Sequence, residues 1–438
     1  MDEQTAGRII GPGRATPKEG VTMSDREFDV VVFGASGFVG RLTALYLAEH
    51  APAGTKIALA GRSESKLARV RGELPAPAAE WPLIIADTND AATLEEMAGR
   101  TRVVCTTVGP YLRYGEGLVA ACAEAGTDYV DLTGEVPFVR RCIDEFADRA
   151  TANGARIVHS CGFDSVPSDL GTYVLHKKIQ EDGTGEMTGT TMVVRKLRGG
   201  VSGGTIDSMR VIAQQAADPA VRRVLGNPHA LSTGPGERAR VKRSEEPGDM
   251  ALVDASKVDP GLGGTLAPFF MASHNTRIVR RSNALLDGAY GSDFHYGETM
   301  AVGRTPVVST AVAGAVSAGT ALFLGAMSIK PVRSVLDRIL PKAGEGPSEQ
   351  TRERGHFTTE TYTTTTTGAR YRSRFRAQGD PGYKATAVML GESALSLALH
   401  RDALPERAGV LTPATAMGDV LVDRLRAAGV DLDVERVG

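Results

Sequence analysis

A glycine-rich turn follows directly on an apolar run near the start of the chain. The stretch DVVVFGASGFVG, residues 29–40, carries glycines at positions 34, 37 and 40. The apolar part predicts a buried strand, and residues 38–50 predict a helix because apolar side chains recur there at helical spacing. A strand, a glycine-rich turn and a helix in this order are typical of a pyrophosphate site, since the helix dipole and the free amides at the helix start attract the anion. The chain is therefore expected to open with a dinucleotide-binding unit.

The spacing of apolar residues divides the chain into parts with different patterns. Up to about residue 162, short apolar runs alternate with amphipathic stretches, which predicts a doubly wound parallel α/β sheet, Rossmann-like and covered on both faces. Beyond residue 165, Thr-rich stretches with a period near two predict a second α+β domain of mostly antiparallel strands. We expect a disordered extension over 1–25, a nucleotide-binding domain over 26–164, an α+β substrate or oligomerisation domain over 165–383, and C-terminal helices over 384–438 that pack back on the first domain.

Composition excludes several classes of protein. The formal net charge is −2, so no basic excess indicates a nucleic-acid partner. The four cysteines lie 17 to 20 residues apart, a spacing that fits neither a zinc site nor a redox dithiol, and no metal site is expected. The first 24 residues lack the apolar core of a signal peptide. We expect a cytoplasmic protein, with Met23 as a candidate start.

The ends of the predicted strands indicate which dinucleotide is bound. The second strand ends in LAGRSESK, where Arg62 and Ser63 stand at the place that an acidic residue takes in NAD enzymes. A guanidinium and a hydroxyl suit a 2′-phosphate, so the pattern favours NADP. Asp87, after the third strand, is expected at the adenine. The predicted cofactor-binding set is Gly34, Ala35, Ser36, Gly37, Phe38, Gly40, Arg62, Ser63, Asp87, Thr107, Val108 and Gly109.

One long segment carries no charge. Residues 305–329, between Arg304 and Lys330, contain only apolar, small and hydroxyl side chains. The length is enough to cross a bilayer, which takes roughly 20 residues. Small residues at 311, 315 and 319 would also let another helix approach closely. A membrane span, peripheral contact with a membrane or an acyl chain, and a buried or inter-subunit helix in a homo-oligomer all remain open.

Several motifs together resemble one known family. FGASGFVGRL, LAGRSESKL, TTVGPYLRYGEGLVAACAEAGTDYVDLTGE and HSCGFDSVPSDLG are similar to the saccharopine dehydrogenase-like oxidoreductases. RGGVSGGTIDSM, GDPGYKATAVMLGESALSLAL and GVLTPATAMGDVLVDRL extend the resemblance to the actinobacterial trans-acting enoyl reductases, over nearly the whole chain after Met23. The resemblance implies NADPH-dependent reduction of an enoyl thioester held by a polyketide synthase, in the biosynthesis of complex lipids.

The catalytic residues are not identified by this pattern. Reduction needs donors at the thioester oxygen and a proton at the α-carbon. Tyr111, Tyr114 or the backbone of 109–117 are candidate donors, with packing beside the cofactor favoured for the tyrosines. Asp164 and Asp169 are candidate acids or bases, but a cap by Ser168 or Asp169 on the helix LGTYVLHKK is favoured. The loop RGGVSGGT, 198–205, either binds an anion or forms a turn.

Two rival functions remain open. In short-chain dehydrogenases a Tyr-x-x-x-Lys pair acts with an upstream serine, and YVLHK offers Tyr173 and Lys177 with Ser160 thirteen residues before the tyrosine. A chain that binds NADP without catalysis, as a membrane-associated protein, would also fit the uncharged segment. Turnover by Tyr173→Phe tests the first rival.

Overall fold

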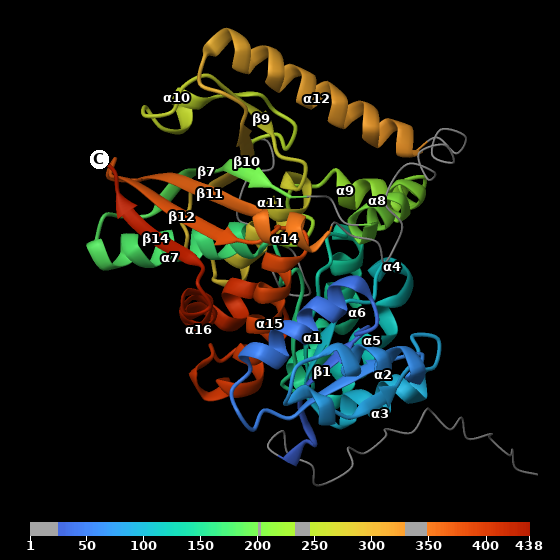
Figure 1. The fold of residues 1–438 in the computed structure, drawn as a ribbon. Helices are drawn as coiled ribbons and strands as arrows, with labels where there is room; N and C mark the ends of the chain where they lie inside the picture. Colours follow the sequence, from blue (N-terminus) through green and yellow to red (C-terminus); the bar gives the residue numbers. More distant parts are fainter. Residues whose placement is uncertain (1–24, 200–202, 233–245, 329–347) are drawn as a thin grey trace, which may run out of the picture.

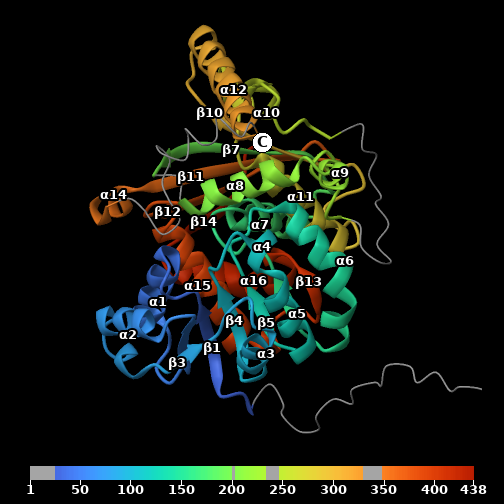
Figure 2. The same cartoon turned by 90° about the vertical axis from the view of Figure 1, so that its right-hand side faces the viewer.

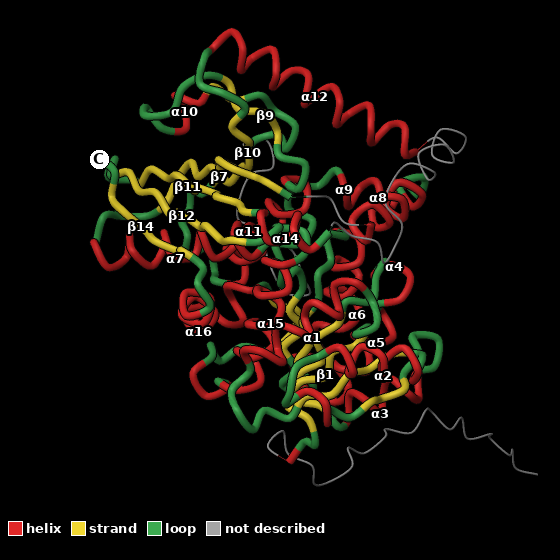
Figure 3. Tube along the Cα trace, viewed as in Figure 1, coloured by secondary structure: helices red, strands yellow, loops and turns green. Residues whose placement is uncertain are grey.

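The computed structural model describes residues 25–199, 203–232, 246–328 and 348–438. The expected extension, Asp25 apart, and Met23 lie outside the described residues. Two seven-stranded sheets, A and B, organise the rest (Figures 1 and 3).

Sheet A is parallel throughout, with strand order β3-β2-β1-β4-β5-β6-β13. The order reverses direction at β1 and β4, and in such sheets ligands bind at the carboxyl ends of the strands flanking that point. Every residue of β1 is buried, which explains its continuous apolar run. The parallel α/β domain is thereby confirmed. Its strands are β1 (Phe28–Phe33), β2 (Ile57–Gly61), β3 (Leu83–Ile85), β4 (Thr101–Thr106), β5 (Asp128–Val130), β6 (Arg156–Val158) and β13 (Gly409–Leu411).

Helices connect the first six strands of sheet A. They are α1 (Phe38–His50), α2 (Glu64–Glu73), α3 (Ala91–Gly99), α4 (Tyr111–Tyr114), α5 (Glu116–Ala125) and α6 (Val136–Ala152). The expected helix over 38–50 has the bounds that apolar spacing indicated.

Sheet B is mixed, with strand order β14-β12-β11-β7-β10-β9-β8. All of its pairs are antiparallel except β7 with β10, so the expectation of mostly antiparallel strands is confirmed. Burial alternates along β12, because its two faces meet different surroundings. The strands are β7 (Met187–Arg198), β8 (Val253–Asp254), β9 (Thr265–Pro268), β10 (His295–Ala301), β11 (His356–Thr365), β12 (Arg370–Gln378) and β14 (Asp431–Arg436).

A layer of helices lies between the two sheets (Figure 1). It contains α7 (Val166–Asp182), α11 (Ala272–Leu285), α15 (Lys384–Leu399) and α16 (Pro413–Ala427). These helices are buried on most sides, and apolar residues of α15 and α16 share one core cluster with β1 and β12. The other α-helices in the described ranges are α8 (Gly203–Gln215), α9 (Pro219–Leu225), α10 (Ala255–Val258), α12 (Pro306–Ser328) and α14 (Glu349–Arg354).

The last part of the chain completes both sheets. β13 pairs with β6 at one edge of sheet A, and β14 pairs with β12 at one edge of sheet B. Residues 384–438 therefore contribute strands as well as the expected helices, and α15 packs against α1 and β4 of the first domain.

The uncharged segment forms the long helix α12, which stands out from the body of the protein (Figure 2). Its first turns join β9 through polar contacts: the Ser309 hydroxyl accepts a hydrogen bond from the Thr265 amide at 2.9 Å, and Thr310 Oγ1 lies 2.6 Å from Thr265 Oγ1. Apolar side chains point outward instead, with Val307 81% and Leu322 76% exposed. Among the described residues, one window of this helix, Pro306–Phe323, is long and apolar enough to cross a membrane by length and composition.

Candidate active site

The turn between β1 and α1 fits closely against the end of β4. Gly34 has φ +86°, and a Cβ there would lie 2.7 Å from Val108 Cγ2. A Cβ at Gly40 would lie 2.2 Å from the carbonyl oxygen of Gly34. Thr107 Oγ1 donates to that same carbonyl at 3.3 Å. Glycine is therefore required at positions 34 and 40, where backbone and neighbouring strand leave no room for a side chain.

The start of α1 offers its amides to a ligand. Gly37 occupies the N-cap position and no side chain caps the helix, while Ser36 and Gly37 are exposed. An uncapped, accessible helix start beside the reversal of the strand order fits the pyrophosphate of a dinucleotide. The second half of the chain also reaches this turn. The ring centroids of Tyr383 and Phe38 are 4.7 Å apart, and the Arg352 guanidinium lies 5.3 Å from the centroid of the Phe38 ring.

The other predicted cofactor residues lie at the carboxyl ends of β2, β3 and β4. Arg62 is exposed directly after β2, as a residue facing a 2′-phosphate must be. The Ser63 hydroxyl caps α2 by accepting from the Lys66 amide, and the Asp87 carboxylate accepts from the backbone and side chain of Asn89. Both side chains thus have structural contacts that the sequence did not indicate.

A buried hydrogen-bond cluster at the ends of β5 and β6 was missed by sequence reasoning. The Asp131 carboxylate accepts from Tyr129 Oη at 2.9 Å and from the amides of Thr133 and Ser160. It also lies 2.7 Å from His159 Nδ1. The signal was available, since polar residues in DLT and HSCG directly follow two neighbouring predicted strands.

Ser160 connects this cluster to the second domain. Its φ is +64°, a region that non-glycine residues adopt at a cost. Its hydroxyl donates to the Thr133 carbonyl at 2.7 Å and lies 2.9 Å from His274 Nε2 of α11. Burial lowers the pKa of His274 to about 3, so the imidazole is neutral. The loops after β5 and β6 are thereby tied to α11.

The two candidate tyrosines differ in their surroundings. Tyr111 is buried; its hydroxyl donates to the Thr106 carbonyl and accepts from the Leu132 amide. Tyr114 is 38% exposed. Glu135 accepts from the first amides of α4 and from Ser208 of α8, so the helix that follows the RGGVSGGT loop packs beside this end of the sheet. Residues 200–202 of that loop lie outside the described residues.

The expected cap at Ser168 or Asp169 is wrong. α7 begins at Val166, with Ser165 at the N-cap and Pro167 in the first turn, so both residues lie inside the helix. The Asp169 carboxylate instead accepts from Ser282 Oγ and from the Ala414 amide at 2.8 Å. It stabilises the start of α16, a helix 245 residues further along the chain.

The tyrosine–lysine pair of the first rival function is not assembled for catalysis. Tyr173 Oη and Lys177 Nζ both contact the Asp419 carboxylate at 3.1 Å. Burial, and then Asp419, raise the pKa of Tyr173, whereas catalysis would need it lowered. Ser160 is bound to His274 instead. The hypothesis of a short-chain dehydrogenase mechanism is therefore not favoured.

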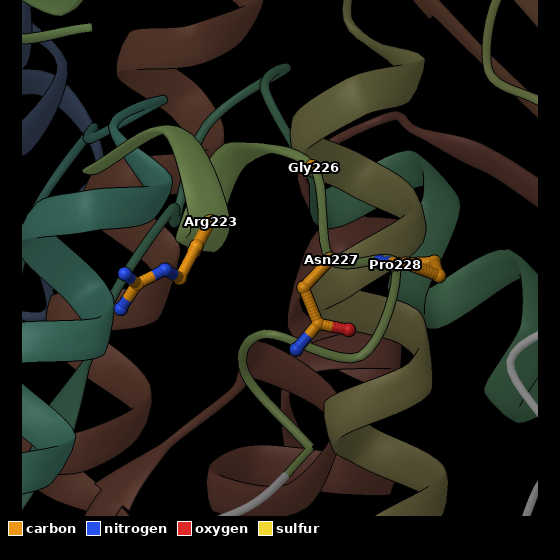
Figure 4. A pocket seen from close by; sticks show the side chains of 4 residues that line it. All are labelled: Arg223, Gly226, Asn227 and Pro228. Carbon is orange, nitrogen blue, oxygen red and sulfur yellow. The ribbon is translucent and has the colours of Figure 1, made fainter. Parts of the chain in front are cut away.

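Within the described ranges, no group of three or more His, Cys, Asp or Glu side chains is placed to hold a metal ion. The four cysteines are buried and unpaired. A cavity of about 570 Å³ lies beside the loop after α9, lined by Arg223, Gly226, Asn227 and Pro228 (Figure 4). It contains none of the predicted cofactor residues.

Comparison with known proteins agrees with this geometry. The family model "Saccharopine dehydrogenase NADP binding domain" matches residues 30–158. The trans-acting enoyl reductase of Mycobacterium tuberculosis strain H37Rv is 49% identical over 94% of this chain and 99% of its own. The trans-acting enoyl reductase of Mycobacterium ulcerans is 48% identical over 95% of this chain and 100% of its own.

Two solved structures share the fold. Saccharopine dehydrogenase (L-Glu forming) of Saccharomyces cerevisiae superposes with a TM-score of 0.51 at 13% identity, over 93% of this chain and 99% of its own. Homospermidine synthase of Legionella pneumophila, in complex with NAD, superposes with a TM-score of 0.51 at 10% identity, over 94% of this chain and 92% of its own.

The fold and the turn at β1 define an NADP-dependent oxidoreductase of the saccharopine dehydrogenase type. Within that class the sequence identity is far higher to one group and covers 95% of this chain. The chain belongs to the trans-acting enoyl reductase family.

Proposed function

We propose that this protein uses NADPH to reduce the carbon–carbon double bond of an enoyl thioester carried by a separate polyketide synthase. Identity of 48–49% along nearly the full length of two trans-acting enoyl reductases carries the proposal. When bound, NADPH supplies a hydride to the β-carbon. The chain's own residues bind the coenzyme, exclude water and place hydrogen-bond donors where charge develops on the thioester oxygen.

The predicted residues at the carboxyl edge of sheet A form the proposed coenzyme site. The turn of Gly34, Ala35, Ser36 and Gly37, with the amide of Phe38, holds the pyrophosphate, and Gly40 lets α1 approach. Arg62 takes the 2′-phosphate, with Ser63 and Asp87 beside the adenosine half. Thr107, Val108 and Gly109 line the path toward the nicotinamide. The exposed, uncapped start of α1 and the exposed Arg62 support these roles.

The decisive experiment combines NADPH deuterated at C4 with the purified protein and an enoyl thioester on a synthase carrier domain. We expect one deuterium at the β-carbon of the saturated product, seen by mass spectrometry. A free small-molecule thioester serves as the comparison, because a partner that presents the substrate should raise kcat/KM. Binding of NADPH without label transfer to any carrier-bound enoyl chain would favour the non-catalytic alternative.

We also propose that the enzyme works in the cytoplasm with α12 in contact with a lipid surface. The helix turns Ser309 and Thr310 toward β9 and leaves Val307, Val308 and Leu322 exposed. Exposed apolar side chains on an uncharged helix favour the boundary of a bilayer over water.

Sedimentation with phosphatidylcholine vesicles tests this contact. The full chain is expected to pellet with vesicles, and a Val308→Asp, Leu322→Asp variant to stay in solution. Ile85→Asp, at an exposed apolar position in β3 of sheet A, at the other end of the molecule from α12 (Figure 2), is the matched control. If the wild type does not bind vesicles, and if it is a dimer that the double variant no longer forms, α12 is a contact between subunits instead.

A further inference from the structure

The loops after β4, β5 and β6 carry several side chains that can donate a proton, and most are already engaged. Tyr111 donates to the Thr106 carbonyl. Tyr129 and His159 are bound to Asp131. Each of the three is also buried, so a substrate carbon cannot reach the proton they hold.

Asp164 is different from these residues. It lies in the loop between β6 and α7, and the residue keeps some solvent exposure although protein atoms surround its carboxyl group. No side chain in the described ranges hydrogen-bonds its carboxylate, which interacts with its own backbone amide. Two titratable groups interact with it electrostatically, namely Asp131, after β5, and the Tyr111 phenol, in α4.

The loop that carries Asp164 is fixed on both sides. The Phe163 amide donates to Thr386 Oγ1 of α15 at 3.0 Å, and Ser165 Oγ lies 3.1 Å from Asn275 Oδ1 of α11. A Cβ at Gly162 would lie 2.6 Å from Leu132 Cδ2, so the loop lies directly against the one after β5. A proton donor held this firmly loses little entropy when it meets its substrate.

The pKa of Asp164 suits a proton donor. Burial raises its pKa to about 7, and the charge of Asp131 adds to the shift, against the opposing effect of its own amide. A general acid works best when its pKa lies near the working pH, because both proton forms are then available.

We propose that Asp164 is the catalytic acid that protonates the α-carbon of the substrate, an inference that rests on the proposed enoyl reductase function. Bound NADPH would supply the hydride for the new bond at the β-carbon, and the π pair of the C=C bond would move onto the thioester as an enolate. That pair then takes the Asp164 proton at the α-carbon. The product is the saturated thioester, the coenzyme is oxidised, and the Asp164 carboxylate regains its proton from water.

Asp164→Asn tests the assignment, since asparagine keeps the shape and removes the acid. We expect kcat to fall by about 10²- to 10⁴-fold, the usual contribution of a positioned acid. Wild-type kcat should decline above about pH 7 as the carboxylic acid ionises, and the variant should lack this decline. The dissociation constant for NADPH, measured by fluorescence, should be unchanged.

A stability measurement separates catalysis from folding. Because the folded pKa lies above the unfolded value, the wild type loses stability as pH rises from about 4 to 7 through this group. The free energy of unfolding of Asp164→Asn should therefore fall less over that range. Asp169→Asn is the control: its carboxylate is buried and fully bonded, so this variant should lose stability yet keep the decline of kcat above pH 7.

The possible outcomes separate the two proposals. If wild type and Asp164→Asn reduce the carrier-bound enoyl chain equally well, with the same pH profile, the role of Asp164 is overturned and the enoyl reductase function stands. If the wild type transfers no label to any enoyl chain, both are overturned.

Discussion

Position 40 on α1 lies so close to the carbonyl of Gly34 that a Cβ there would stand 2.2 Å from its oxygen. Gly40→Ala is therefore expected to push α1 away from the β1 turn and to weaken NADPH binding by at least about tenfold, since misplaced helix amides no longer meet the anion. Fluorescence titration measures the affinity. Gly72→Ala, in α2 where nothing lies within 4 Å, should keep full affinity and gain up to about 1 kcal/mol of stability.

Arg62 is the residue that we propose to select NADPH over NADH. Arg62→Ala is expected to weaken NADPH binding about tenfold or more, because hydrogen bonds to a charged group contribute roughly 1.5–3 kcal/mol, and to leave NADH binding little changed. Isothermal titration with both coenzymes measures the ratio. Arg69→Ala replaces an exposed arginine on the following helix and should change the affinity for neither coenzyme. Equal losses of affinity for NADPH and NADH in Arg62→Ala would contradict the assignment.

Ser160 combines backbone strain with two buried hydrogen bonds, and two substitutions separate the effects. Ser160→Ala loses the contacts with Thr133 and His274 and keeps φ +64°, so we expect a loss of about 1–3 kcal/mol of stability. Ser160→Gly loses the same contacts without the strain and should be more stable than the alanine variant by about 1–2 kcal/mol. Urea unfolding measures both. Equal stabilities would show that the turn is not strained.

Tyr173 is expected to be dispensable for turnover. Tyr173→Phe removes one hydrogen bond to Asp419, which should lower the free energy of unfolding by about 1 kcal/mol or less and leave kcat unchanged. Steady-state kinetics with a carrier-bound enoyl thioester provides the measurement. A large drop in kcat at unchanged NADPH affinity would restore the tyrosine–lysine mechanism.

Local signals in the sequence were sufficient for the first six strands of sheet A and its first turn, but not for β13, which lies where only helices were expected. Strands such as β1 are buried on both faces, so their apolar runs are continuous, and the helix after Gly37 has regular apolar spacing. The alternating burial of β12 is likewise consistent with the period of two that predicted β7, β11 and β12, whereas the other four strands of sheet B were not predicted.

Contacts between distant segments could not be predicted in this way. His274 reaches Ser160 across 114 residues, and Asp169 reaches Ala414 across 245. No local pattern encodes such pairs. The start of α7 was predictable in part, because Pro167 is favoured in the first turn of a helix, and this signal outweighs the preference of Asp169 for a cap. Asp164 was named from its motif, but its access and lack of a side-chain partner are visible only in three dimensions.

Both sheets obtain an edge strand from the final thirty residues, through β13 and β14. A nascent chain emerging from the ribosome thus carries the coenzyme turn long before either sheet can be closed. Apolar surface of β1 and β12 that α15 and α16 later cover stays accessible during that interval. Closure of both sheets therefore waits until residues 384–436 have been synthesised and packed.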